Sequence, residues 1–352
     1  MTFEQQATAY AVLSEALDSV YPQGDPTRPR LVGPDPSGFH VAPSVDPKGQ
    51  PRLDYLVNFS NAAGSALYVG TSAARDQRGP FLPKARAPPP PPLTPPAHPA
   101  PQAVTHHEYI EIDSTNAASS SFLDNTRQIG REVVRAVRAS AFPHMPVWAG
   151  EIGPHNGGNT PPNCQGNGVC GRYGSTLWYA DALGAKAREG YSAFFRQDFL
   201  GADYGLVNYT SFAPSPDFWL LAVWRLAVGA RVLNATQAQA PYSHTTRTYA
   251  FCGRAPGTLL VLALNLDPGA SACVAAPALA SGAAQRTQWV LQPGAGGVLS
   301  PDILLNGAPL ALDADGRAPS LAGAQVPAGD QLTLPPLGIT LALWATSAEA
   351  CA

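Results

Sequence analysis

Apolar residues recur at two different spacings along this chain, and the spacing changes near residue 230. Before that point, segments with apolar residues every three or four positions alternate with short apolar runs, as in helices that alternate with strands. Such alternation indicates a parallel α/β sheet or barrel. The predicted helices span residues 2–20, 120–139, 172–183 and 216–228, and the predicted strands span residues 104–110, 147–151 and 191–195.

Two helix ends carry local signals. Gly184 is expected to end the 172–183 helix, because glycine readily adopts the left-handed conformation that follows many helices. Ser215 is expected to cap the last helix, with Pro216 at its first position and Asp217 in its first turn.

The segment after residue 230 has a different pattern. Helical periodicity is lost, and short runs of β-forming residues at 258–266, 287–291 and 340–344 are separated by Gly and Pro turns. This pattern is typical of an all-β module, which we interpret as a β-sandwich. The predicted organisation is therefore an α/β part that includes residues 104–229, followed by a β-sandwich at residues 230–352.

Residues 68–103 interrupt the first part. They are rich in proline, with an unbroken run of five from Pro88 to Pro92, and they lack apolar periodicity. A stretch of this composition cannot bury enough apolar surface to fold, so we expect a disordered insertion.

Composition excludes some classes of function. Charged residues make up only 13% of the chain and the net charge is −3, which argues against a nucleic-acid-binding protein. No run of about 18 apolar residues is present, so no transmembrane segment is expected. The N-terminus lacks the pattern of a signal peptide. Three Asn-X-Ser/Thr motifs predict glycosylation at Asn58, Asn208 and Asn234.

Polar side chains gather at the ends of three predicted strands. Glu151 ends the 147–151 strand and leads into a loop rich in Gly and Asn; residues 105–109 and 195–197 end the strands on either side. In a (β/α)8 barrel these ends converge on the active site, which favours Glu151 as a catalytic residue. The His106–His107 pair also suggests a metal site, but no third ligand follows at a useful spacing. No metal or other cofactor is therefore expected.

Several segments resemble glycoside hydrolase family 79, the heparanase and heparanase-like family. The resemblance is collinear and covers residues 104–352 well and residues 2–67 weakly. It rests on residues 147–158, 177–184, 196–207, 214–219, 229–233, 305–307 and 334–336. It implies a retaining glycoside hydrolase that acts on β-glucuronosyl linkages of polysaccharide or proteoglycan glycans, with a glucuronic-acid-containing glycan as its substrate.

The resemblance also implies roles for individual residues. Glu151 matches the nucleophile, Tyr109 matches a tyrosine that hydrogen-bonds to it, and His107 matches a nearby active-site histidine. The positions that match substrate-binding residues are Asn156, Gly157, Gly158, Gln197 and Tyr204. The family commonly has tyrosine where this chain has Asn156, so this position departs from the pattern.

One element of the family is absent. Its general acid/base lies in an Asn-Glu-Pro sequence, which this chain does not contain. Residues 1–67 resemble the part of the barrel that begins after its fourth strand, so we expect the N-terminal half of the barrel to be missing and this chain alone to be inactive. The alternatives are a catalytically dead remnant, a carbohydrate-binding protein, or a retaining hydrolase of the same barrel type that acts on another sugar.

Five cysteines leave the redox state open, and fully reduced thiols remain an alternative. Cys164 and Cys170 lie in one loop and can form a local disulfide. The resemblance implies a second disulfide between Cys252 and Cys351, which leaves Cys273 free. It also implies a secreted or lysosome-like glycoprotein, with membrane association as a further expectation.

Overall fold

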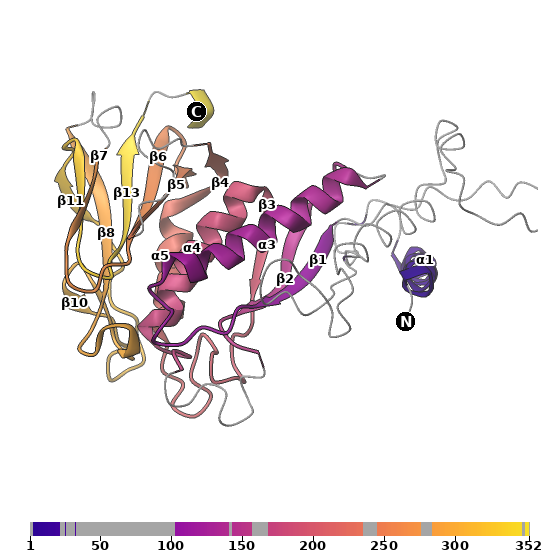
Figure 1. Ribbon diagram of the computed structural model, residues 1–352, viewed down its shortest axis with the longest axis horizontal. Helices are drawn as coiled ribbons and strands as arrows, with labels where there is room; N and C mark the ends of the chain where they lie inside the picture. Colours follow the sequence, from indigo (N-terminus) through magenta and orange to yellow (C-terminus); the bar gives the residue numbers. More distant parts are fainter. Residues whose placement is uncertain are drawn as a thin grey trace, which may run out of the picture.

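The computed structural model describes residues 3–21, 25, 32, 103–140, 143–156, 168–234, 245–275, 284–346 and 349–351. The predicted insertion at residues 68–103 lies outside these ranges except for Ala103. Figure 1 shows a parallel sheet, a layer of helices and an antiparallel sheet side by side, with helix α1 apart from them. Helix α1 spans Phe3–Val20, as the sequence predicts.

The first sheet contains three parallel strands in the order β1-β2-β3. Helices follow each strand in the chain, because parallel neighbours need a crossover connection. The strands are β1 (Val104–Tyr109), β2 (Val147–Gly153) and β3 (Tyr191–Arg196), and the helices are α3 (Ser120–Ala139), α4 (Tyr173–Glu189) and α5 (Pro216–Ala227). The predicted alternation of strand and helix is therefore confirmed for this part of the chain.

The antiparallel part begins directly after α5. An eight-stranded sheet has the order β10-β9-β8-β13-β6-β5-β4, with β11 paired to β8, and a separate two-stranded sheet pairs β12 with β7. Its strands are β4 (Val228–Leu233), β5 (Thr246–Gly253), β6 (Thr258–Asn265), β7 (Ala272–Ala275), β8 (Gln285–Pro293), β9 (Ile303–Leu305), β10 (Ala308–Pro309), β11 (Ala324–Pro327), β12 (Gln331–Leu334) and β13 (Ile339–Ala345). Short 3-10 helices span Gly297–Leu299 and Glu349–Cys351. The domain boundary at residue 230 stays a prediction.

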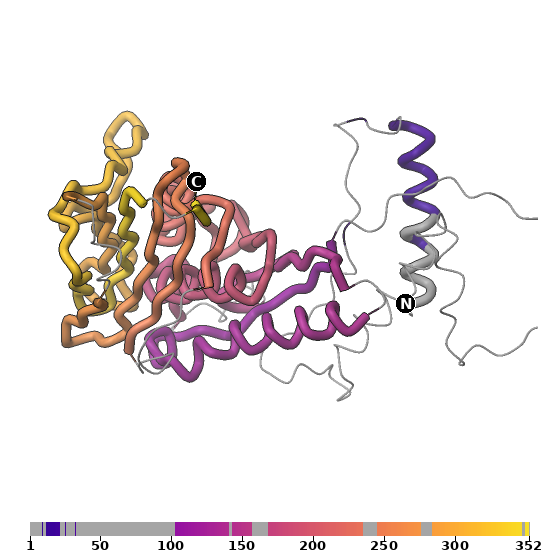
Figure 2. The backbone as a smooth tube through the Cα atoms, turned by 90° about the horizontal axis from the view of Figure 1, so that it is seen from above, coloured from indigo at the N-terminus to yellow at the C-terminus, as the bar shows by residue number. Residues whose placement is uncertain are grey.

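Helix α4 is enclosed between the two sheets, as Figures 1 and 2 both show. Every residue from Tyr173 to Lys186 is buried, which explains why its apolar residues do not keep to one face. Helix α3 instead buries a single stripe that includes Ile129, Val133 and Val137, as its periodicity predicts.

Specific polar contacts join α4 to the antiparallel sheet. The hydroxyl of Tyr173 donates to the carbonyl oxygens of Leu291 at 3.0 Å and Leu337 at 2.7 Å. The hydroxyl of Tyr249 on β5 donates to Asp181 Oδ1 on α4 at 2.6 Å. These hydrogen bonds hold the antiparallel sheet against helix α4.

The predicted end of the 172–183 helix is wrong. Helix α4 continues through Gly184 to Glu189 and ends at Gly190, whose φ of 101° is the left-handed conformation expected of a terminating glycine. Gly184 has a packing role instead. A Cβ atom there would lie 2.3 Å from Tyr249 Cδ2, so only glycine lets β5 approach the helix this closely.

Two further local predictions need correction. Strand β2 extends two residues beyond Glu151, to Gly153, because its pairing with β1 continues through Tyr109. Ser215 occupies the N-cap position of α5, but its side chain makes no capping hydrogen bond. Among the described residues, no helix is long and apolar enough to cross a bilayer.

Candidate active site

Three side chains meet at the carboxyl end of the parallel sheet. His107 on β1 is the register partner of Glu151 on β2. The hydroxyl of Tyr109 donates a hydrogen bond to Glu151 Oε1, and His107 Nδ1 lies 3.5 Å from the same oxygen. The side chain of Glu151 keeps 31% of its surface exposed, so a ligand can reach the carboxylate.

Tyr109 is the donor in this contact. Burial, and next its hydrogen bond to Glu151, raise the pKa of the Tyr109 phenol well above its ordinary value. The phenol therefore keeps its proton at neutral pH. A hydrogen bond donated to a carboxylate stabilises its charged form, which is the form that acts as a nucleophile.

Glycine at position 153 makes room for this tyrosine. A Cβ atom on Gly153 would lie 2.6 Å from Tyr109 Cε1 and 3.5 Å from the carbonyl oxygen of Gln197. The position of the Tyr109 ring against β2 therefore depends on the missing side chain, whereas the distance to Gln197 is an ordinary van der Waals contact.

Tyr204 completes one side of the site. Its ring centroid lies 6.2 Å from that of Tyr109, and burial is the main cause that raises the pKa of the Tyr204 phenol. Arg196 at the end of β3 donates to the carbonyl oxygen of Tyr204 at 2.8 Å and pairs with Asp217 at 2.7 Å. Both charged side chains are only 2% exposed, so the loop that carries Tyr204 is held by a buried ion pair.

Asp217 was expected only as a charge in the first turn of α5. Its carboxylate instead accepts hydrogen bonds from Ser175 at 2.7 Å and Thr176 at 2.8 Å on α4, as well as from Arg196. The sequence signal that could have indicated this role is Arg196, which lies at the end of a predicted strand. An arginine at a strand end requires a partner when it is buried.

The other predicted substrate-binding residues are placed only in part. The backbone N–H of Gln197 donates to the carbonyl oxygen of Ile152 at 2.9 Å, which puts Gln197 beside the end of β2. Asn156 is exposed and follows β2 by three residues. Gly157 and Gly158 lie outside the described residues.

The sequence interpretation missed a contact between two loops of the site. Glu111, two residues after β1, pairs through Oε2 with His155 Nε2 at 2.9 Å. Its Oε1 accepts the backbone N–H of Asn156 at 3.1 Å. The sequence marks Glu111 only as an acidic loop residue, because the pairing depends on how two strand ends align.

The two adjacent histidines of β1 lie in different surroundings. His106 is fully buried, with Nε2 2.7 Å from the hydroxyl of Tyr191, whereas His107 is next to Glu151. Successive strand residues point to opposite faces, so the pair does not act as one unit. Among the described residues, no group of three or more His, Cys, Asp or Glu side chains could hold a metal ion.

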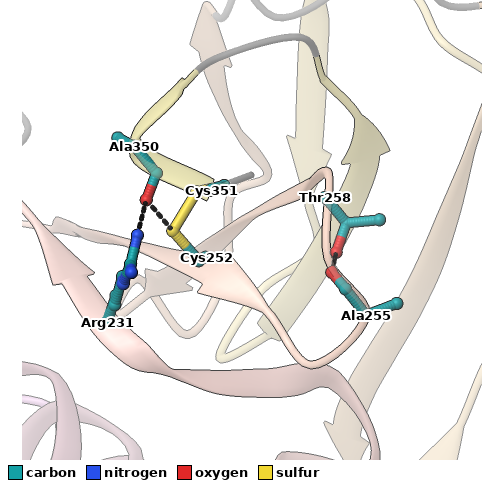
Figure 3. Close-up of a disulfide and its surroundings, with 6 residues drawn as sticks. All are labelled: Arg231, Cys252, Ala255, Thr258, Ala350 and Cys351. Carbon is teal, nitrogen blue, oxygen red and sulfur yellow. Dashed lines mark hydrogen bonds between the residues drawn. A yellow bond between two sulfur atoms is a disulfide. The ribbon is translucent and has the colours of Figure 1, made fainter.

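A disulfide links Cys252 on β5 to Cys351 at the end of the described chain, the pairing implied by the family resemblance (Figure 3). The carbonyl oxygen of Ala350 beside it accepts a hydrogen bond from Arg231 at 2.9 Å. Cys170 is also disulfide-bonded and Cys273 is a free, exposed thiol, while Cys164 lies outside the described residues.

Two of the three predicted glycosylation sites can be located. Asn208 and Asn234 are both exposed, as glycosylation requires. Asn58 lies outside the described residues.

Comparison with known proteins gives matches to heparanases and glucuronidases. Heparanase from Gallus gallus is 32% identical over 65% of this chain and 44% of its own length. Baicalin-beta-D-glucuronidase from Scutellaria baicalensis is 26% identical over 66% of this chain and 43% of its own length. No family model matches the chain.

The fold also has counterparts among solved structures. A 4-O-alpha-L-rhamnosyl-beta-D-glucuronidase from Fusarium oxysporum has a TM-score of 0.58 and 14% identity, over 97% of this chain and 64% of that one. The chain spans less than half the length of the curated relatives it matches.

Proposed function

Since this chain is heparanase-like over 65% of its length, we propose that it is part of a retaining glycoside hydrolase that acts on β-glucuronosyl linkages of polysaccharide or proteoglycan glycans. The observation that carries this proposal is the hydrogen bond from Tyr109 to Glu151, with His107 beside the same carboxylate oxygen. An oriented carboxylate at the carboxyl end of a parallel sheet has the chemistry of a glycosidase nucleophile.

In the proposed reaction, Glu151 attacks the anomeric carbon, the bond from that carbon to the glycosidic oxygen breaks, and the leaving group departs with the bonding electrons. Water then hydrolyses the covalent glycosyl-enzyme intermediate and frees the Glu151 carboxylate. Tyr109 and His107 both lie at Oε1, so we assign the attack to Oε2. Tyr109 holds the carboxylate in one orientation, which lowers the entropic cost of reaching the geometry for attack.

A retaining mechanism needs a second carboxylate about 5 Å from the first, to protonate the leaving oxygen and later to activate water. The sequence contains no Asn-Glu-Pro, the motif that supplies this group in the resembling family. We assign the role to a segment that this chain does not contain. A substrate whose leaving group departs without protonation does not need the general acid. The rate at which such a substrate loses its leaving group therefore measures the attack by Glu151.

We further propose that strands β1, β2 and β3 are the sixth to eighth strands of a partial (β/α)8 barrel and that the antiparallel strands form a C-terminal β-sandwich. The alternation of parallel strands with α3, α4 and α5 supports the first assignment. The two-stranded sheet of β7 and β12 packs against β6 of the large antiparallel sheet, on the apolar cluster that also includes Trp344. This packing of one sheet on another supports the assignment of a β-sandwich.

The proposed substrate carries little charge beyond its uronic acid. Binding of densely sulfated chains requires clustered Lys and Arg side chains. The stretches that correspond to the family's basic clusters are residues 35–40 and 242–247, and Arg247 is the only Lys or Arg in either. Arg247 is buried, and its guanidinium pairs with Asp124 at 2.7 Å and lies 3.7 Å from Asp181. It is therefore not available to bind a sulfate.

The Cys252–Cys351 disulfide supports a secreted or lysosome-like location, because disulfides persist in oxidising compartments. The exposure of Asn208 and Asn234 supports their use as glycosylation sites. Membrane association remains part of the proposal and rests on the resemblance alone.

The second candidate function is that of a carbohydrate-binding remnant without catalytic activity. The absence of an Asn-Glu-Pro motif favours it. The two candidates differ in one measurable respect: a remnant binds a glucuronide without breaking an activated glycosidic bond, whereas a nucleophile at Glu151 releases the leaving group.

Hydrolysis of dinitrophenyl β-D-glucuronide tests the proposal, because this leaving group needs no protonation. On natural glycans, whose leaving group needs the absent general acid, we expect the chain alone to be inactive. On this activated substrate we expect it to release dinitrophenol, with a loss of about 1,000-fold or more in Glu151→Gln, equivalent to ~4 kcal/mol of transition-state stabilisation. Glu349→Gln, at an exposed glutamate of the C-terminal 3-10 helix, is the matched control. Equal rates in the wild type and Glu151→Gln would refute the assignment of Glu151.

A further inference from the structure

We propose that Glu111 is a positioning residue, which fixes residues 154–156 just beyond the nucleophile strand and so holds Asn156, a proposed substrate-binding residue, in a defined place. The inference rests on the proposed function. Its basis is the double contact of one carboxylate: Oε2 with His155 Nε2 at 2.9 Å, and Oε1 with the backbone N–H of Asn156 at 3.1 Å. Both partners follow β2, the strand that carries Glu151.

The backbone around Glu111 supports the same contact. The N–H of Ile112 donates to the carbonyl oxygen of Pro154 at 2.8 Å, and Asp113 forms an isolated antiparallel bridge with Gly168. Residues 111–113 therefore contact the chain on both sides of residues 157–167. A single short segment after β1 thus contacts both Pro154 and Gly168.

Glu111 itself is in an unfavourable backbone conformation. Its φ is 55°, in the left-handed region that non-glycine residues seldom adopt. Glycine would suit this position better on backbone grounds alone. The contacts of the carboxylate with His155 and Asn156 offset that cost.

The location of these contacts connects them to the site. Pro154 follows the last residue of β2 directly, and Asn156 is one of the positions that match substrate-binding residues of the family. A substrate-binding group acts only when it is held at hydrogen-bond distance from the ligand. Loss of the Glu111 contacts should therefore weaken sugar binding and leave the Tyr109–Glu151 contact in place.

Two substitutions of Glu111 in the full chain distinguish the effect of its contacts from the effect of its negative charge. Glu111→Gly removes both contacts and relieves the backbone strain, so the fold should be retained. Glu111→Gln keeps an acceptor for the Asn156 N–H and a polar group for His155, but it removes the charge. The matched control is Asp315→Asn, since Asp315 is an exposed carboxylate that pairs with Arg317 at 2.6 Å in a distant turn.

Hydrogen exchange of the Asn156 amide, followed by NMR, tests the contact without reference to function. We expect exchange at least tenfold faster in Glu111→Gly, and exchange within threefold of wild type in Glu111→Gln and Asp315→Asn. Unchanged exchange in Glu111→Gly would overturn the inference.

Affinity for methyl β-D-glucuronide, measured by NMR titration of the same proteins, tests the consequence. We expect at least fivefold weaker binding by Glu111→Gly and near wild-type binding by Glu111→Gln and Asp315→Asn. Equal losses in the Gly and Gln variants would contradict a positioning role, because charge alone would then explain them. A wild-type chain that does not bind this glucuronide would instead overturn the proposed function.

Discussion

Replacement of Gly153 by alanine should impair the active site without changing any polar residue. The new Cβ atom would lie 2.6 Å from Tyr109 Cε1, closer than real Cβ contacts allow, and 3.1 Å from Cδ1, which is a tight contact. The ring of Tyr109 must then shift, and we expect this shift to draw its hydroxyl away from Glu151 Oε1. Overpacking of this kind costs typically ~1–3 kcal/mol of stability.

The effect on rate follows from the lost hydrogen bond. Hydrogen bonds to charged groups contribute ~1.5–3 kcal/mol, which corresponds to about 10- to 150-fold in rate if the bond persists in the transition state. We expect kcat/KM for dinitrophenyl β-D-glucuronide to fall by this factor in Gly153→Ala. Urea denaturation should show a separate loss of stability.

A double-mutant cycle with Tyr109→Phe identifies the cause. Phenylalanine keeps the ring, so the steric conflict with the added Cβ atom persists, but the hydrogen bond to Glu151 is already absent. Gly153→Ala should therefore destabilise the Tyr109→Phe protein yet change its rate less than about threefold. A rate loss as large as in the wild type would refute the argument that Gly153 acts through Tyr109.

Three further predictions concern stability and specificity. Burial, and next the charge of Lys186, hold the pKa of His106 well below its ordinary value, so the unfolded chain binds a proton that the folded chain does not. The free energy of unfolding should therefore fall as the pH drops below about 6.5, by up to ~1.4 kcal/mol per pH unit, and His106→Gln should lack this part of the slope in urea denaturation; equal slopes would contradict it. Gly184→Ala would stabilise an ordinary helix by ~1 kcal/mol, but here it should lower the melting temperature, because the added Cβ would lie 2.3 Å from the ring of Tyr249. At physiological salt the chain should bind weakly charged glucuronic-acid glycans of the arabinogalactan side-chain type more tightly than heparan sulfate, and the reverse order in parallel titrations would refute the assigned substrate class.

Local patterns in the sequence predict the four described α-helices and the three parallel strands, but only three of the ten antiparallel strands, β6, β8 and β13. Helix α3 has the predicted bounds, Ser120–Ala139, because one face of it is buried and the period of its apolar residues is therefore visible. Helix α4 is longer than predicted because Gly184 serves packing against Tyr249, a contact with a residue far along the chain. No local signal separates a glycine that ends a helix from one that makes room for a neighbouring ring.

The same limit applies to the site. Glu151, Tyr109 and His107 follow from the family resemblance, and the observed register of β1 and β2 puts His107 opposite Glu151. The contacts of Glu111 with His155 and Asn156 depend on how two loops leave neighbouring strands, which the sequence does not specify. The pairing of the buried Arg247 on β5 with the partly exposed Asp124 on α3 likewise joins residues far apart in the sequence.

The central claim is that Glu151 is the nucleophile of a retaining reaction, and covalent trapping tests it most directly. A fluorinated glucuronosyl fluoride has an activated leaving group, so attack does not require the general acid, and the fluorine slows hydrolysis of the adduct. After incubation of the wild-type chain with this reagent, intact-mass measurement and peptide sequencing should find a single glucuronosyl adduct on Glu151 and none in Glu151→Gln. An adduct on another carboxylate, or the same adduct in Glu151→Gln, would contradict the account.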